Sequence, residues 1–383
     1  MNSADFHDFK PSYLNPAELA ETLLDRWAAV DLGRVARIRT TDKWLLSSAL
    51  QKLIRRGHAD TAVAVALRLH DVDPAYLQRR LPVIAAEDVG VADMPACFDV
   101  VTLCTSARWW RTDPRRTIQY AVTALAQAAK SRAMCDAACL GDGMAALFAR
   151  HAPPFSASRA ELIDVAIDSS ASLIARVNAL RVLGGIQVRD GRYYKTLSRC
   201  DLAALDAVAE LLDVPPLARW LMSKQPRTAG LAALLPIAVE AATQATQPGR
   251  PGRLQSIAQV GAIPLCAVDQ FSAIGKGVLA KFFRANEALR DFAAERVAPR
   301  ASAATFTMAL FHVESSILDR RLASPLLDEL TEETEVIELR RCGLLRGSDG
   351  HQLYEVLQGQ MPLLNDMRKS ALEESAVGAV GVL

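Results

Sequence analysis

The chain has 383 residues, 51% of them hydrophobic and 23% charged, a composition that can bury a sizeable core and that excludes an intrinsically disordered protein. Its 44 Lys and Arg balance 43 Asp and Glu, which excludes a globally basic nucleic-acid coat and an acidic tail protein but not a local basic face. The sequence has no apolar run of about 18 residues and no secretory leader, so we expect a soluble, cytoplasmic protein without membrane contact.

The first part of the chain predicts an antiparallel array of helices joined by short loops. Asn15-Pro16 is typical of a capped helix start, with Asn as the N-cap and Pro in the first turn. Apolar residues at three- and four-residue spacing predict the helices that follow. They span residues 43–56, 59–70, 74–90, 94–107 and 114–129. We place a first domain at residues 1–150, because Pro153-Pro154 marks a boundary.

The rest of the chain is also predicted to be mainly helical. Its one convincing strand signal is the alternation at residues 185–195 around Asp190-Gly191, which predicts a small β-hairpin. The predicted helices span residues 160–180, 201–223 with an interruption at Pro215-Pro216, 274–297 and 301–318. Residues 247–253 are predicted to be an exposed, mobile linker, and the last 20 residues to be frayed. We therefore expect a helical domain with the hairpin at 151–247 and a helical C-terminal region at 253–383.

Motifs that would indicate an enzyme or a cofactor are missing from the sequence. Around Gly275-Lys276-Gly277 the spacing of a phosphate-binding loop is not met, because Gln270 stands where its first Gly belongs. Cys135 and Cys139 are close in sequence, but no second pair follows at zinc-site spacing. We therefore expect no enzymatic activity, no cofactor and no metal.

Basic residues cluster at or near the predicted helix ends, next to aromatic residues. Such mixtures can pair with phosphates and stack on bases, although a basic pair at a helix end also caps the helix. The candidate nucleic-acid contacts are Arg55, Arg56, Arg79, Arg80, Trp109, Trp110, Arg115, Arg116, Lys130 and Arg132, with Lys276, Lys281 and Arg284 on a later helix.

Two other kinds of site are conceivable from the sequence. Residues 202–224 resemble a helix-turn-helix, with Arg219 and Lys224 as the available contacts on the second helix. An enzyme with its site between the domains would use His312, Glu314 or the Glu87-Asp88 pair. A Glu-Asp pair near Arg79-Arg80 also suits charge-assisted bonds between neighbouring helices.

Residues 44–147 resemble the C-terminal region of the RarA/MgsA family, AAA+ ATPases that are related to clamp loaders and include the Werner-helicase-interacting ATPase. The family's Ser-Ala-Leu-x-Lys helix is similar to Ser48-Ala49-Leu50-Gln51-Lys52. Its Glu-Asp-Ile-Gly-x-Ala-Asp signature is similar to Glu87-Asp88-Val89-Gly90-Val91-Ala92-Asp93. Its late Pro-Lys-Ser-Asn is similar to Ala129-Lys130-Ser131-Arg132.

The resemblance implies a clamp-loader-collar-like helical domain and a replication or repair setting. It also implies a homo-oligomer, with a tetramer as the expected form because the family's region forms homotetramers. Only about 40 residues precede the similar block, too few for the AAA+ module, so the resemblance implies no ATPase activity, and a separate ATPase or replisome subunit is a conceivable partner. The sequence thus predicts a non-enzymatic, oligomeric protein that binds DNA, either single-stranded or forked, or a replisome factor through a basic helical surface. The alternatives are a protein adaptor of a mobile element or defence system, and a regulator that uses residues 202–224.

Overall fold

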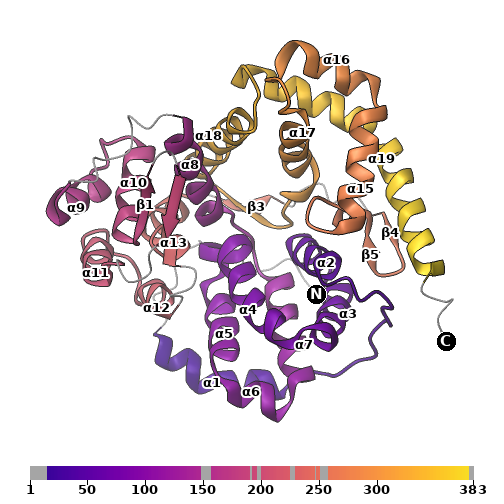
Figure 1. The fold of residues 1–383 in the computed structure, drawn as a ribbon. Helices are drawn as coiled ribbons and strands as arrows, with labels where there is room; N and C mark the ends of the chain where they lie inside the picture. The colour runs from indigo at the N-terminus through magenta and orange to yellow at the C-terminus, as the bar shows by residue number, and fades with distance from the viewer. Residues whose placement is uncertain are drawn as a thin grey trace.

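The computed structural model describes residues 15–147, 157–189, 192–195, 200–224, 229–245, 247–250 and 258–378, and its architecture is mainly α-helical (Figure 1). The predicted fold class is confirmed. In this part of the chain no helix is long and apolar enough to cross a membrane. The predicted domain boundary at Pro153-Pro154 lies outside the described residues, and the division into domains stays a prediction.

The first part of the chain forms the expected helical array, at the bottom and centre of Figure 1. Its helices are α1 Pro16–Ala28, α2 Lys43–Arg55, α3 Ala59–Val72, α4 Pro74–Ile84, α5 Met94–Thr105, α6 Ala107–Thr112, α7 Pro114–Gln127 and α8 Ala133–Leu147. Asn15 caps α1 by accepting the Ala17 amide, as the sequence predicts. Side-chain caps also begin α2, α4, α5 and α7, from Asp42, Asp73, Asp93 and Asp113. Local sequence therefore fixes where these helices start.

The middle part contains short helices and one antiparallel strand pair. Its elements are α9 Arg159–Ile167, α10 Leu173–Leu183, β1 Ile186–Arg189, β2 Arg192–Lys195, α11 Leu202–Leu211, α12 Pro216–Lys224, α13 Ala229–Ala232 and α14 Leu235–Thr243. Strands β1 and β2 pair as predicted, while their turn at 190–191 lies outside the described residues. The single helix predicted at 160–180 is wrong, because Asp168 accepts the Ser170 amide and Ser172 caps a new helix.

The C-terminal part corrects three predictions. Its elements are β3 Gln247–Arg250, β4 Gln259–Val260, β5 Ile263–Pro264, α15 Ala273–Ala285, α16 Glu287–Arg296, α17 Ser302–Leu310, β6 Arg321–Ala323, α18 Pro325–Arg341 and α19 Gly350–Gly378. The first residues of the predicted linker form β3, which pairs with β6. Asn286 caps α16 and so divides the helix expected at 274–297. The part predicted to be frayed is helical as far as Gly378, because Leu364, Arg368 and Leu372 recur every four residues on a buried face of α19, and residues 379–383 lie outside the described residues.

The helical array and the C-terminal part share one hydrophobic core, which extends from Leu19 to Leu372. Helix α18 packs along α8, and α2 packs against the 3₁₀ turn Leu265–Ala267 that precedes α15. The Ala- and Val-rich helix α3 is buried between α2, α4 and α7 of its own chain. The apolar residues of α3 are therefore buried by helices of the same chain, and their burial needs no second subunit.

Candidate functional site

Helix α2 buries its polar face as well as its apolar one. Ser48, Gln51, Lys52 and Arg55 recur at the three- and four-residue spacing of one helix face, and each is less than a tenth exposed. The opposite face carries buried leucines and packs against α3 and α7. Buried polar groups cost free energy unless they are paired, so the partners of this face determine how α2 is held.

Asp88 is the central partner of that face and is completely buried. Its Oδ1 accepts from Arg55 Nε at 2.6 Å, and its Oδ2 accepts from Gln51 Nε2 at 2.7 Å. Arg132 Nη1 lies 3.5 Å from Oδ1. Within the predicted signature Glu87, Asp88 and Gly90, Asp88 is thus the buried anchor: it lies in the π-helical turn Ala85–Val89, and Gly90, with φ +50°, ends that turn.

The same face of α2 is bound to the C-terminal part of the chain. Lys52 Nζ lies 2.5 Å from Asp269 Oδ2 and donates to the Cys266 carbonyl at 2.6 Å. Arg55 Nη1 donates to the Ser315 carbonyl at 2.8 Å, and Arg56 Nη2 to the Glu314 carbonyl at 2.6 Å.

Arg368 of α19 completes this contact and has no exposed surface. Its Nη1 lies 2.9 Å from Glu314 Oε1. We refer to the whole set as the charged seam. It consists of Lys52, Arg55, Arg56, Asp88, Arg132, Asp269, Glu314 and Arg368.

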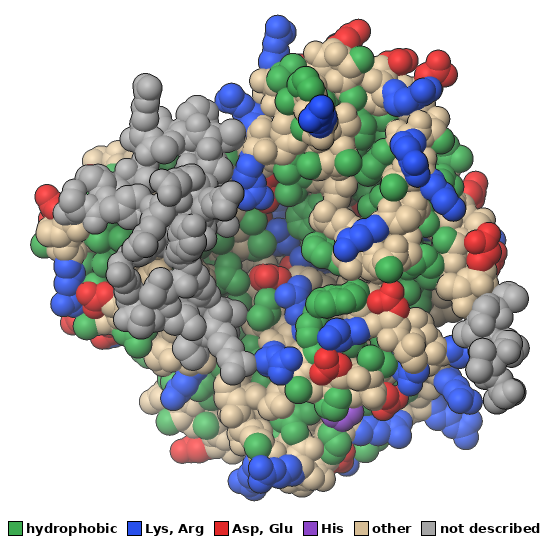
Figure 2. Space-filling model, viewed as in Figure 1, with side chains coloured by type: hydrophobic (Ala, Val, Ile, Leu, Met, Phe, Trp, Pro, Cys, Tyr) green, Lys and Arg blue, Asp and Glu red, His purple; other side chains and the backbone are tan. Residues whose placement is uncertain are grey.

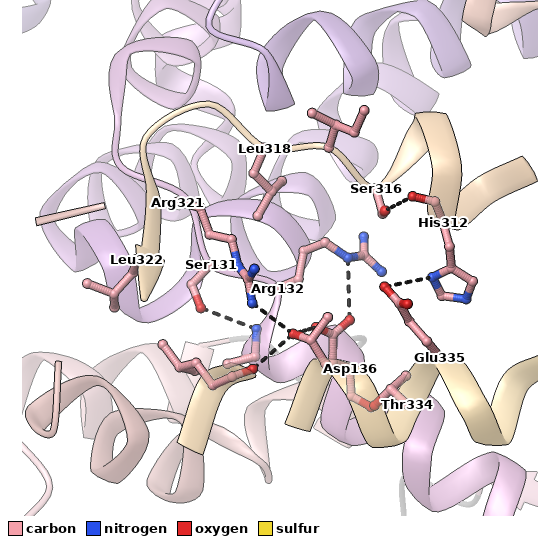
Figure 3. Close-up of a pocket in the computed structure, with 14 residues that line it drawn as sticks. Ser131, Arg132, Asp136, His312, Ser316, Leu318, Arg321, Leu322, Thr334 and Glu335 are labelled. Atoms are coloured by element: carbon pink, nitrogen blue, oxygen red, sulfur yellow. Dashed lines mark hydrogen bonds and ion pairs between the residues drawn. The ribbon is translucent and has the colours of Figure 1, made fainter. Parts of the chain in front are cut away.

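A smaller cavity of about 250 Å³ lies on one side of Arg132 (Figure 3). Arg132 Nε lies 3.4 Å from Asp136 Oδ1, and Thr331 Oγ1 donates to Asp136 Oδ2 at 3.1 Å. Burial raises the pKa of Asp136, while Arg132 acts in the opposite direction. On the far wall His312 Nδ1 lies 3.7 Å from Glu335 Oε1, and the Ser316 hydroxyl donates to the His312 main-chain carbonyl rather than to its ring. These contacts do not form a nucleophile–base pair.

A larger cavity of about 450 Å³ is also lined by Arg132, together with residues of α2, α4, α8, α15, α17, α18 and α19. Trp44 and Phe271, each at least half exposed, form its rim. Arg55, Arg132 and Arg368 are buried and form its floor. Basic and acidic side chains are visible beside hydrophobic ones in the recess at the centre of Figure 2. A hydrogen bond from the Cys139 thiol to Cys135, together with burial, raises the pKa of Cys139, so this wall thiol is protonated near neutral pH and is a poor nucleophile.

Of the residues considered for catalysis, Asp88 and Glu314 belong to the charged seam, whereas Glu87 and His312 do not, and each is held by a charged neighbour. His312 is placed between Glu335 and Glu338, with Nε2 3.1 Å from Glu338 Oε2. Asp88 and Glu314 pair with arginines. Within the described ranges no three His, Cys, Asp or Glu side chains are grouped so that they could hold a metal ion. This geometry binds two parts of the chain together, and the expected lack of enzymatic activity stays a prediction.

Four of the predicted nucleic-acid contacts are buried in the structure. Arg55, Arg56, Lys130 and Arg132 are each less than a tenth exposed. Lys130 has no exposed surface, and its Nζ donates to the Ala126 carbonyl at 2.9 Å, near the C-terminus of α7. Sequence reasoning expected these cations at helix ends to face solvent. The structure instead pairs them with carboxylates and carbonyls inside the protein, so they do not form part of its surface.

Of the remaining candidates in the helical array, Arg79 and Arg115 are exposed, while Arg80 and Arg116 are half-buried. Arg80 Nη2 lies 3.5 Å from Glu87 Oε2 at the larger cavity. Arg116 Nη1 donates to the carbonyl of Ala28, the last residue of α1, and to that of Val30 in the loop that follows. The array therefore presents a smaller set of exposed cations than the sequence predicts.

The paired tryptophans pack against neighbouring helices rather than standing free. The Trp109 ring contacts Trp27 edge-on at 5.2 Å between centroids, and the Arg108 guanidinium lies over it. Trp110 Nε1 donates to the Leu103 carbonyl at 3.0 Å. Neither ring is an exposed platform, which a base-stacking role would need.

The predicted basic helix presents its cations to solvent. Lys276, Lys281 and Arg284 are all exposed on α15, while the neighbouring Phe282 and Phe283 are buried in the core. Helix α15 lies at the upper right of Figure 1, away from α7 at the bottom. The exposed basic residues therefore form separate patches.

Sequence reasoning missed an arginine-rich loop between α1 and α2. Arg34, Arg37 and Arg39 are exposed on this loop. Its backbone is held by hydrogen bonds, from Arg115 Nη2 to the Gly33 carbonyl at 3.2 Å and from Arg68 Nε to the Thr40 carbonyl at 2.9 Å. Lysine and arginine side chains gather near this loop at the lower right of Figure 2. Three arginines within six residues of a non-helical segment were the available signal.

The helix-turn-helix-like segment forms two helices, α11 and α12, as its sequence indicates. Arg219 lies 2.8 Å from Asp206, and Lys224 lies over the Trp220 ring. The apolar face of α12, which includes Leu217 and Leu221, is buried and packs toward α5. Both candidate base contacts therefore already have partners in the chain.

Comparison with known proteins gives one finding, in the helical array. Residues 58–145 match the family model described as the C-terminal domain of the MgsA AAA+ ATPase. The resemblance read from residues 44–147 is confirmed over this range, which spans α3 to most of α8. No curated protein and no solved structure matches the chain.

Proposed function

Because residues 58–145 match the C-terminal domain of an AAA+ ATPase family, we propose that this protein is a non-enzymatic component of DNA replication or repair that binds DNA through an exposed basic surface. The matched segment supports the replication or repair setting. The charged seam, which uses its ionisable residues to join two parts of the chain, supports a role in binding rather than in catalysis.

One observation carries the DNA contact: the exposed arginines of the loop between α1 and α2 adjoin Arg115 of α7. We call Arg34, Arg37, Arg39 and Arg115 the arginine surface. Guanidinium groups form forked hydrogen bonds with phosphate, and the hydrogen-bonded loop presents them from a held backbone. These residues take the place of the buried Arg55, Arg56, Lys130 and Arg132 in the proposed contact.

A second patch on α15, Lys276, Lys281 and Arg284, is a further candidate for the same contact. These cations lie on one exposed helix face, and Arg284 Nε donates only to the Ala280 carbonyl of its own helix. A long or forked DNA could reach both patches, whereas a short oligonucleotide would distinguish between them.

The test is a binding measurement on the full chain with labelled single-stranded and duplex DNA at several salt concentrations. Binding is expected to weaken as salt rises, because each phosphate contact releases counterions. Arg37→Glu/Arg39→Glu should weaken binding to all sequences and reduce the salt slope by about one per contact removed. Lys281→Glu/Arg284→Glu tests the α15 patch in the same assay.

The matched control is Arg346→Glu/Lys369→Glu, which changes the net charge equally at exposed positions outside both patches. Equal losses in the control and in both test variants would show a general charge effect and overturn the assignment. No DNA binding by the unmodified chain would leave the protein-adaptor function, and preference for one short duplex sequence would favour a regulator.

We further propose that the chain self-associates, as the matched family region implies. Helix α3 is buried in its own chain, so the contact between subunits must use another surface. Light scattering coupled to size exclusion tests this directly: a single mass above 41.5 kDa that does not change on dilution supports the proposal, and a monomer overturns it.

A further inference from the structure

The larger cavity combines a basic floor with an aromatic rim, and neither feature is explained by the DNA surface. Five basic and three acidic side chains line it. The basic ones are Lys52, Arg55, Arg80, Arg132 and Arg368, and the acidic ones are Glu87, Asp269 and Glu338. Its volume of about 450 Å³ falls within the range of small-molecule sites, roughly 300–1,000 Å³.

Two of the lining arginines have hydrogen-bond donors without partners. Arg368 is fully buried, and its Nη2 has no acceptor, although Nε and Nη1 are bound to Val268 and Glu314. Arg80 Nε is likewise buried without an acceptor. Unpaired buried donors are rare and need an acceptor, such as a ligand or an ordered water. Both belong to guanidinium groups, which favour phosphate and carboxylate oxygens.

The rim offers flat apolar surfaces close to this basic floor. Trp44 is 50% exposed and Phe271 58%, although large aromatic side chains are usually buried. Tyr76 contacts Trp44 edge-on at 5.7 Å, so the Trp44 ring is held from one side. Polar groups of Ser47 and Gln51 line the wall between rim and floor.

We propose that this cavity binds a nucleoside monophosphate. The base stacks on Trp44 and Phe271 at the rim, and the phosphate accepts from the two unpaired donors, Arg80 Nε and Arg368 Nη2. Such a ligand has the required order of parts: a planar apolar ring, a polar sugar and a dianionic end. Stacking on aromatic side chains tolerates any base, so the site discriminates by the phosphate more than by the base.

The test is calorimetric titration of the full chain with AMP, with CMP and with inorganic phosphate. Both nucleotides should bind once per chain, and inorganic phosphate at least about tenfold more weakly, because it lacks the stacking contribution. Trp44→Ala should weaken nucleotide binding about tenfold and leave phosphate binding unchanged. Arg80→Gln should weaken the binding of the nucleotides and of inorganic phosphate by about tenfold.

The matched control is Arg79→Gln, because Arg79 is the adjacent exposed arginine and does not line the cavity. Trp44 and Arg80 are both partly exposed, so the variants should keep the thermal unfolding midpoint of the unmodified chain. The proposal is overturned if neither nucleotide binds, or if Arg79→Gln weakens binding as much as Arg80→Gln does. Arg37→Glu/Arg39→Glu should bind nucleotide normally, which separates this site from the proposed DNA contact.

Discussion

Arg55-Arg56 and Arg115-Arg116 are the same dipeptide near a helix end, yet the structure uses them in opposite ways. The first pair, at the end of α2, is buried and reaches Asp88 and the main-chain carbonyls of Ser315 and Glu314. In the second pair, at the start of α7, Arg115 is exposed and Arg116 is half-buried. They bind carbonyls at the end of α1 and in the loop that follows it. A basic pair therefore indicates a surface only where no other part of the chain covers it.

The contrast follows from what packs on each helix. Helix α2 has the π-helical turn at Asp88 on one side and the C-terminal part of the chain on the other, so its cations are removed from water and need carboxylates. Helix α7 meets the end of α1 and the extended loop that follows it, which offer carbonyls and leave charge exposed. Three changes test this contrast between buried and exposed charges.

The largest effect is expected for Asp88→Asn. It leaves Arg55 buried without its charge partner, which should lower the free energy of unfolding by about 3–5 kcal/mol. Urea denaturation measures this. The control is Asp206→Asn, which breaks the exposed pair with Arg219 and should cost less than about 1 kcal/mol. Similar losses in the two variants would show that burial does not distinguish the pairs.

A pH effect of intermediate size is expected at Lys130. Burial, helped by Arg320, lowers the pKa of Lys130 in the folded protein to about 8, whereas an unfolded lysine titrates near about 10.4. Between these values the unfolded chain binds more protons, so the stability contributed by this site rises with pH. Relative to Lys130→Met, the unmodified chain should gain about 2 kcal/mol from about pH 7.5 to about pH 9.5.

The comparison with Lys130→Met cancels the thiol and tyrosine titrations that act in the same pH range. Lys281→Met serves as the control, since Lys281 is exposed, and its stability relative to the unmodified chain should not change with pH. A flat difference for Lys130→Met as well would mean that Lys130 is as solvated as Lys281.

The smallest effect is expected from comparing the two arginine pairs directly. Arg56→Met leaves the buried Glu314 carbonyl without its donor and should cost about 1–2 kcal/mol. Arg115→Met removes a longer, exposed hydrogen bond to Gly33 and should change stability by less than about 0.5 kcal/mol. Chemical denaturation of both variants is the measurement, and a reversed order would contradict the burial of the first pair.

Much of the first helical array could be predicted from local sequence. Asn15 and Pro16 begin α1 as expected, and the apolar spacing of α2 and α3 matches their buried residues. The Glu87-Asp88 signature identified the related family over residues 58–145. The helix breaks at Asp168 and Asn286 were missed, because a side chain that caps the next helix looks the same in sequence as one that faces solvent.

The sequence by itself determined the helical class, most helix starts in the first array and the family resemblance, because caps and apolar spacing act between residues that are close in the chain. Only the tertiary structure decided which charges are buried. Lys52 and Asp269, or Arg56 and Glu314, are separated by more than 200 residues and meet because α2 packs against the C-terminal part. The larger cavity likewise exists only where the helical array and the C-terminal part meet, since its rim and floor come from segments that no local pattern connects.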